Sequence, residues 1–224
     1  MPERNLEQMA EAVADIRRRM AEAAREAGRD PAAVQLCAAC KTHTPATIAL
    51  SAGLPIDLFG ENHVQELCAN YEAGAYCGKP VHFIGHLQTN KIKKVLGKAS
   101  LIQSVDSPRL LAALEKEASK LDMIQDILLE VNIGEEASKT GVSPEALWAL
   151  LDEAAAQPHL RVRGLMAIPP VKADDGENRA LLRQVYGLFV RAGERGYENA
   201  IREGATIVRI GTAIYGARDY GPKA

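Results

Sequence analysis

Residues 34–43 read VQLCAACKTH, an apolar run of strand length that ends on a lysine and holds two cysteines spaced as C-x-x-C. Side chains alternate along a strand, so Cys37 and Lys41 share one face while Cys40 points to the other. Redox C-x-x-C motifs open a helix, and a zinc site needs a second pair at matching spacing, which the two remaining cysteines do not offer. We therefore interpret Cys37 and Cys40 as core residues.

Lys41 is then the residue of interest in this segment. If the odd-numbered positions face the inside of a barrel, its amine projects from the end of the first strand into the barrel mouth. A lysine at a strand end that reaches solvent explains this position. A desolvated amine that forms a Schiff base with an aldehyde explains it equally well.

Similar apolar runs recur along the chain, and each is followed by a polar loop and a helical segment. Strands are predicted at 34–40, 56–60, 81–85, 101–105, 127–133, 161–168 and 206–211. Helices are predicted at 5–27, 45–52, 62–73, 87–96, 107–121, 143–156, 177–193 and 197–203. Repeated βα units with nearly continuous apolar strands indicate a parallel sheet covered by helices.

Two closures of such a sheet are possible, an open doubly wound sheet and a (β/α)8 barrel. The first strand lacks a G-x-G-x-x-G motif after it, which argues against a dinucleotide-binding sheet. Barrel enzymes build their sites from the loops after the strands, and polar residues follow nearly every strand here. These are Lys41, Thr42, Glu61, Asn62, His86, Asp106, Asn132 and Thr212. We expect residues 1–224 to form a single TIM barrel domain, (β/α)8, with an extra N-terminal helix.

The eighth strand of that barrel has no counterpart in the sequence. After the helix that ends near Ala192, the stretch GERGYENAIREGATIVRIG (193–211) passes from a glycine-rich turn directly into another helix. A strand with its loops would need roughly ten to fifteen residues there. Either the strand is deleted or a stretch before Tyr197 is omitted from the sequence, and we favour omission because a lost strand exposes two edges. An intact mass of 24.2 kDa would instead establish the deletion.

The second constellation is IVRIGTAIYG, residues 207–216, at the end of the last strand. Gly211 lets the backbone approach a ligand and Thr212 adds a hydroxyl, which together suit a phosphate. A plain strand-to-helix turn explains the same residues. A closed barrel would bring this turn beside Lys41, and an aldehyde and a phosphate within one small ligand describe pyridoxal 5'-phosphate (PLP).

Seven segments resemble, in order and spacing, the signature segments of the pyridoxal phosphate homeostasis protein family. They read CKTHTPATIALSAG, FGENHVQE, VHFIGHLQTNK, SVDS, VNIGEEASKTG, VRGLMAIPP and VRIGTAIYGARDY. The resemblance covers the chain from about residue 5 to residue 220 and implies a barrel like the N-terminal domain of alanine racemase. The chain departs from the family between Ala192 and Tyr197, where the family has a seventh strand and half of its phosphate cradle.

The resemblance implies that Lys41 forms a Schiff base with PLP and that Arg209 faces the pyridine nitrogen. A fixed cation there disfavours protonation of the ring and leaves it a weaker electron sink. The resemblance also implies that Gly211 and Thr212 hold the phosphate.

Asn62 and Met166 match pocket-wall positions of the family. Lys139 is a second candidate for transient contact with the cofactor. His82 and His86 are interpreted as structural hydrogen-bonding residues of the third strand and its loop, rather than as catalytic groups.

The function that follows is a PLP-binding protein for intracellular PLP homeostasis, which delivers the cofactor to apo-enzymes without substantial catalysis. Racemases of this resemblance carry a second catalytic base on an additional β domain, and we expect none after Ala224. The alternatives are a PLP-dependent amino acid racemase of weak activity and a Schiff-base aldolase, which the lack of an acid partner near Lys41 disfavours.

The net charge and the distribution of apolar residues exclude several other classes of protein. A net charge of −2 gives no general attraction to nucleic acid or anionic membrane, and no apolar stretch is long enough to span a bilayer. The N-terminus has no signal-like apolar region. We expect a cytoplasmic monomer with reduced cysteines and with no nucleic-acid or membrane partner.

Overall fold

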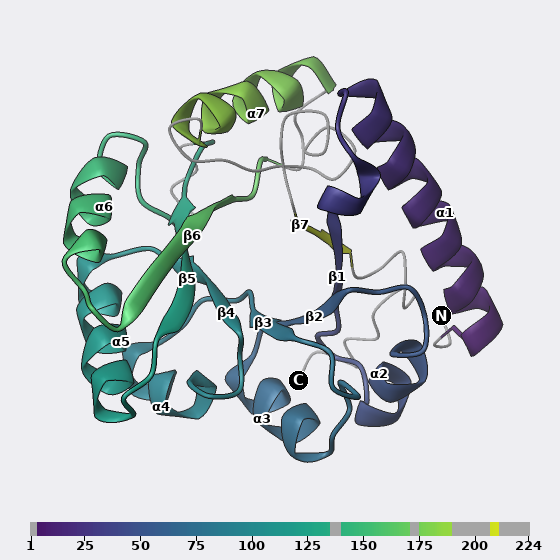
Figure 1. The fold of residues 1–224 in the computed structure, drawn as a ribbon, viewed down its shortest axis with the longest axis horizontal. Coiled ribbons are helices and arrows are strands. Elements are labelled where there is room, and N and C mark those ends of the chain that lie inside the picture. Colours follow the sequence, from purple (N-terminus) through teal and green to yellow (C-terminus); the bar gives the residue numbers. More distant parts are fainter. Residues whose placement is uncertain (1–3, 135–139, 171–174, 190–206, 211–224) are drawn as a thin grey trace, which may run out of the picture.

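The computed structural model describes residues 4–134, 140–170, 175–189 and 207–210. Figure 1 shows the strands arranged around a central axis with the helices outside them. The strands are β1 (Gln35–Ala39), β2 (Leu58–Glu61), β3 (Val81–Phe83), β4 (Leu101–Val105), β5 (Gln125–Val131), β6 (Leu160–Ala167) and β7 (Ile207–Ile210). The helices are α1 (Leu6–Glu26), α2 (Pro45–Ser51), α3 (Val64–Glu72), α4 (Ile92–Val95), α5 (Pro108–Lys120), α6 (Leu147–Ala155) and α7 (Asp175–Phe189), with 3-10 turns η1 (Pro31–Ala33) and η2 (Thr89–Lys91).

The seven strands predicted from the sequence are confirmed, and they pair in parallel in the order β6-β5-β4-β3-β2-β1-β7. This parallel strand order, with the helices outside the strands, agrees with the predicted barrel architecture. Among the described strands, β6 and β7 remain the two edges of the sheet and no pairing closes the ring. The stretch in which the missing strand was expected, between residues 192 and 197, lies outside the described residues.

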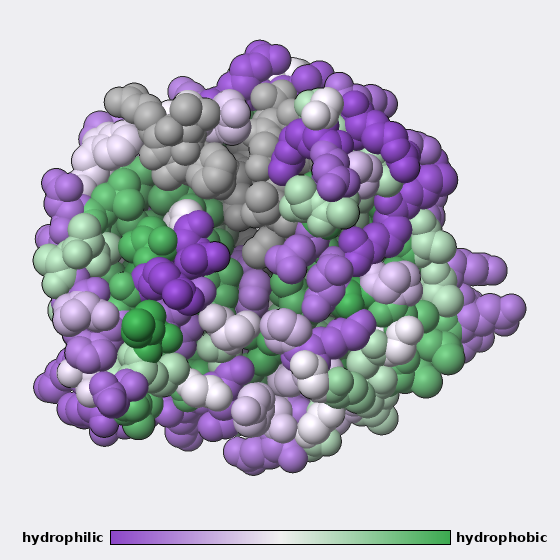
Figure 2. Space-filling view, viewed as in Figure 1, coloured by the Kyte–Doolittle hydropathy of each residue, from purple (hydrophilic) through white to green (hydrophobic). Residues whose placement is uncertain are grey.

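Helix α1 is the predicted extra N-terminal helix. Asn5 and Gln8 form a reciprocal capping box that fixes its first turn. Its apolar positions at helical spacing are buried, and its outer surface is largely hydrophilic (Figure 2). The chain leaves the helix at Gly28, whose φ of 67° is a conformation that glycine adopts without steric cost.

The two faces of β1 pack against different surroundings. Ala38 and Cys40 belong to the large core between the sheet and the helices. Cys37 points to the other side, where its sulfur lies close to the space that a side chain at Gly60 would occupy, together with Ile84. The two cysteines are therefore buried on opposite faces as free thiols, as their alternation along the strand predicts.

Two helical segments are shorter than predicted. The expected helix at 87–96 becomes η2 followed by the single turn of α4, which stops before Gly97 at a φ of 76°. The expected helix from 143 begins only at Leu147. Val142 pairs with β5, since its N–H donates to the Glu130 carbonyl and its carbonyl accepts from Asn132 N–H, and residues 144–146 form a turn between this pairing and α6.

Candidate functional site

Lys41 and Asn62 follow neighbouring parallel strands and lie at the same edge of the sheet. Cys40 N–H donates to the carbonyl of Gly60 at 3.0 Å, so the pairing of β1 with β2 continues to the residues just before them. Both side chains are half-buried. Within the described residues, neither side chain has a hydrogen bond or an ion pair. This leaves an amine and an amide available to a ligand at the carboxyl ends of the strands.

The backbone turns sharply directly after Lys41. Thr42 has a φ of 69°, a left-handed conformation that is rare for a β-branched residue. The turn is closed by His43 N–H, which donates to the Cys40 carbonyl at 3.1 Å, and Thr42 N–H approaches Glu66 Oε2 on α3 at 3.4 Å. Strained backbone of this kind persists where the surrounding structure fixes it, and it is concentrated at functional sites.

Met166 is brought to the inside of the sheet by a bulge. The register between β5 and β6 shifts between Ile127 and Leu128, and Gly164 on β6 has a φ of 146°. Beyond the bulge Leu165 packs in the helix-side core, while Met166 joins Leu128 in a separate small cluster and is 2% exposed. Met166 therefore lies on the inner side of the sheet, and its role as a pocket-wall residue stays a prediction.

The remaining predicted residues lie on or after β7. The backbone of Arg209 is in register with Cys37 on β1, so it sits one strand away from Lys41 and deeper in the sheet. The side chain of Arg209, together with Gly211, Thr212 and Lys139, lies outside the described part of the structure. The structure thus brings Lys41, Asn62, Met166 and the Arg209 backbone to one sheet, and the phosphate half of the prediction stays a prediction.

A buried carboxyl group connects the ends of β1 and β2. Glu61 is fully buried, and its Oε1 accepts from Asn70 Nδ2 at 2.7 Å, from the Tyr76 hydroxyl at 2.9 Å and from Cys40 Sγ at 3.3 Å. Its Oε2 is buried without a hydrogen-bond partner in the described residues. Burial raises the pKa of Glu61 above the ordinary carboxyl range, and it also raises the pKa of the Cys40 thiol.

The sequence indicated Glu61 only as one of several polar residues after a strand. It belongs instead to the helix-facing side, because it alternates with Phe59, which lies in the helix-side core. Counting the alternation outward from Phe59 is the signal that could have found this carboxyl group.

The interior of the sheet also contains polar side chains from β3 and β4. His82 is buried and its Nδ1 lies 2.9 Å from Gln103 Nε2, an amide that can only donate, so Nδ1 accepts. His86 Nδ1 lies 3.6 Å from Asp106 Oδ2 in the neighbouring loop. These contacts agree with the structural interpretation of both histidines.

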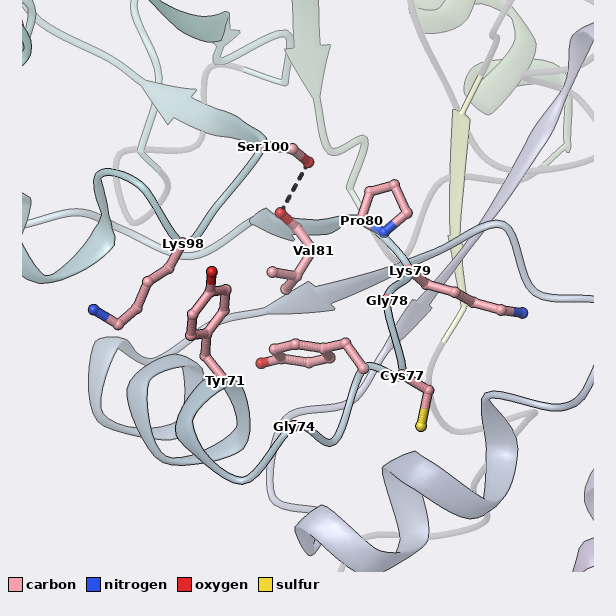
Figure 3. A pocket seen from close by; sticks show the side chains of 10 residues that line it. Tyr71, Gly74, Cys77, Gly78, Lys79, Pro80, Val81, Lys98 and Ser100 are labelled. Carbon is pink, nitrogen blue, oxygen red and sulfur yellow. Dashed lines mark hydrogen bonds between the residues drawn. The ribbon is translucent and has the colours of Figure 1, made fainter. Parts of the chain in front are cut away.

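A cavity of about 360 Å³ lies at the opposite end of the sheet, where the strands begin (Figure 3). Tyr71 and Tyr76 line it, and two of the polar side chains around it, Lys79 and Ser100, already have hydrogen-bond partners. Lys79 Nζ donates to two backbone carbonyls at 2.9 and 2.5 Å, and Ser100 Oγ donates to the Val81 carbonyl at 3.1 Å. We therefore place the candidate site at the mouth around Lys41 and not in this cavity.

The described residues form neither of two other kinds of site. No group of three or more His, Cys, Asp or Glu side chains there is arranged to hold a metal ion. None of the described helices is both long enough and apolar enough to cross a membrane.

The chain is similar to known proteins in both sequence and structure. The family model described as alanine racemase, N-terminal domain, matches residues 12–219. A relative from Aquifex aeolicus, named pyridoxal phosphate homeostasis protein, is 38% identical over 94% of this chain and 98% of its own length. That alignment runs over 224 positions, more than the 94% of this chain that it covers, so it includes positions that this chain lacks.

The structural neighbours agree with the sequence relatives. PipY of Synechococcus elongatus, solved with PLP bound, superposes with a TM-score of 0.78 at 29% identity and covers 93% of this chain and 100% of that chain. An alanine racemase from Clostridium difficile superposes with a TM-score of 0.69 at 11% identity, covering 91% of this chain and 60% of that chain. At that identity the racemase shows a shared fold alone.

Proposed function

The chain belongs to the family of the pyridoxal phosphate homeostasis proteins and carries the alanine racemase N-terminal domain fold; from this premise we propose that it binds PLP at the mouth around Lys41. The PLP-bound structure of PipY supports the choice of ligand. The observation that carries the proposal is the placement of Lys41, whose half-buried amine stands at the carboxyl end of β1 without a partner among the described residues.

The residues of this mouth fit such a ligand. Lys41 offers the primary amine that an aldehyde requires, and the chemistry supplied on binding is a reversible carbon–nitrogen bond formed with loss of water. Asn62 offers an amide beside the amine, and Met166 offers an apolar wall inside the sheet. The register of β7 supports a role for Arg209, Gly211 and Thr212 on the neighbouring strand and its loop.

We further propose that the protein is a carrier rather than an efficient enzyme. Racemisation at an amino acid α-carbon uses a base on each side of the reacting carbon, and among the described residues of the proposed site we assign one such base, Lys41. An arginine at the pyridine nitrogen would also weaken the ring as an electron sink. We propose a single domain over residues 1–224 that acts as a cytoplasmic monomer and transfers PLP to apo-enzymes when their amines displace Lys41.

Transfer can be tested with the PLP-loaded protein and an apo-aminotransferase. Direct delivery predicts that the rate of aminotransferase activation rises with the concentration of apo-enzyme, because the recipient takes part in the displacement step. Activation at a constant rate, equal to the rate of PLP release into buffer, would contradict delivery. Proton–deuterium exchange at the α-carbon of alanine, measured on the same loaded protein, would support the racemase alternative if it turned over rapidly.

A further inference from the structure

We propose that Glu61 is the positioning residue of this site, which sets the position of Lys41 through Cys40 and of Asn62 through its own backbone. The inference rests on the proposed function in one respect, which is the assignment of Lys41 as the ligand-binding amine. Glu61 does not reach the ligand itself, because its carboxyl points to the helix side of the sheet and is fully buried.

The geometry places Glu61 between the two residues that it would position. Cys40 directly precedes Lys41, and its thiol lies 3.3 Å from Glu61 Oε1 and 3.3 Å from the carbonyl of Gly60. Asn62 directly follows Glu61 in the chain. Glu61 Oε1 therefore joins Cys40, at the end of β1, to Glu61, the last residue of β2. Each of these two residues directly precedes a predicted ligand contact, Lys41 or Asn62.

The same oxygen is anchored to the layer outside the sheet. Asn70 Nδ2 on α3 donates at 2.7 Å, and the hydroxyl of Tyr76, in the turn after α3, donates at 2.9 Å. Hydrogen bonds from neutral donors to a buried carboxyl are strong in a low-dielectric interior. Removing this acceptor leaves Asn70 Nδ2 and the Tyr76 hydroxyl without it, while the Cys40 thiol keeps the Gly60 carbonyl at 3.3 Å. Without Glu61, the turn that begins at Lys41 loses its link to α3 through the thiol, while Thr42 N–H keeps its 3.4 Å contact with Glu66 Oε2.

A role of Glu61 in packing alone predicts a different result for substitutions at this position. If Glu61 merely filled space, replacing it with an unbranched apolar side chain of similar length would change stability alone and would leave Lys41 in its position. If Glu61 positions the mouth, the acceptor oxygen matters, so Glu61→Gln keeps the function and Glu61→Met loses it. A shift of about 1 Å in the position of a reacting group can lower its rate of reaction by up to about a hundredfold.

The first measurement follows the Lys41 amine without any ligand. Lysines are reductively methylated with ¹³C-formaldehyde, and the Lys41 signal is assigned by its loss in Lys41→Arg. We expect Glu61→Met to move or broaden this signal while Glu61→Gln leaves it near the wild-type position. Because no PLP is present, this readout stays meaningful even if the proposed function fails.

The second measurement is the apparent Kd for PLP from the absorbance change. We expect Glu61→Met to raise the Kd at least about tenfold and Glu61→Gln to stay within about threefold of wild type. The matched control is Glu115→Met, which removes a carboxylate that accepts from His159 N–H at 3.0 Å and lies 2.7 Å from His159 Nδ1. It should lower stability while leaving both the Kd and the Lys41 signal unchanged.

A folded Glu61→Met protein with a wild-type Lys41 signal and a wild-type Kd would overturn the proposal. If Glu61→Met does not fold, Cys40→Ala serves in its place, since it removes only the thiol link and leaves Asn70 and Tyr76 on Glu61. Cys40→Ala should shift the Lys41 signal in the same direction by a smaller amount, and an unshifted signal would again contradict the positioning role.

Discussion

The two ends of the sheet use polar residues in opposite ways. Where the strands begin, Asp57 accepts from Arg17 Nη2 at 2.6 Å and from Leu36 N–H at 2.5 Å, and Lys79 is held by two carbonyls. Where the strands end, Lys41 and Asn62 have no such partner among the described residues. The difference supports our proposal that the beginning of the sheet serves stability and that its end binds a ligand, the usual arrangement in barrels of this kind.

The largest effect is expected from Gly85→Ala, at the ligand end. A Cβ built on Gly85 would overlap the carbonyl group of Asn62, and backbone atoms cannot yield as a flexible side chain can. We expect the free energy of unfolding to fall by more than about 3 kcal/mol in urea titrations. Gly53→Ala is the control, because a Cβ there meets no atom within 4 Å. Equal stability of the two variants would show that the backbone around Asn62 is not tightly fixed.

The next effect is expected at the other end, from Asp57→Ala. Loss of the acceptor leaves the Leu36 amide without its bond and Arg17 Nη2 without its partner, while Arg17 Nε keeps the Pro55 carbonyl at 2.8 Å. We expect a loss of about 1–2 kcal/mol because the ion pair is partly exposed. The apparent Kd for PLP should not change. A raised Kd in a folded Asp57→Ala protein would contradict the proposed division between the two ends of the sheet. Asp57→Asn tests whether the charge of Asp57 or its hydrogen bond to Leu36 contributes more to stability.

A pH dependence follows from Glu61, whose pKa is raised by burial. A raised pKa means that the native state keeps a proton which the unfolded state has already lost. From the ordinary carboxyl pKa of about 4.5 up to the raised value, stability should therefore fall as pH rises. Glu61→Gln should flatten this part of the profile in thermal melts across that range. An unchanged slope would assign the pH dependence to other carboxyl groups.

A smaller effect is expected from placing glycine at two residues with left-handed backbone, one at each end of the sheet. Thr42→Gly and Asp122→Gly replace residues with φ of 69° and 47°, and each should raise stability by up to about 1 kcal/mol. Only Thr42→Gly should weaken PLP binding, because the freed turn follows Lys41. A loss of affinity in Asp122→Gly instead would contradict the assignment of the ligand to the carboxyl end.

The smallest effect is expected from Glu22→Gln on the surface of α1. Arg18 Nη1 lies 2.9 Å from Glu22 Oε1, but both side chains are about half exposed and Arg18 also contacts Asp15. Exposed pairs of this spacing contribute little, so the change in melting temperature should be within error at physiological salt. A marked loss would mean that α1 depends on its outer surface as well as on its buried face.

The sequence was sufficient for the architecture because each strand is an apolar run followed by a helix. Alternation also correctly separated Cys37 from Cys40, whereas the role of Lys41 as the ligand-binding amine stays a prediction. The sequence could not place Met166 by alternation, because the bulge at Gly164 changes which face the following residues occupy. Nor could it show that Glu61 gathers Asn70 and Tyr76, since that network forms only when α3 packs against β2.

The most direct test of the central claim is to trap the bound ligand on the protein. The full chain is mixed with PLP, its absorbance is recorded, and the complex is reduced with borohydride and mapped by peptide mass spectrometry. The account predicts a visible absorption band and a reduced pyridoxyl group on the peptide that contains Lys41, both lost in Lys41→Ala. A pyridoxyl group on another lysine, with the band retained in Lys41→Ala, would contradict it.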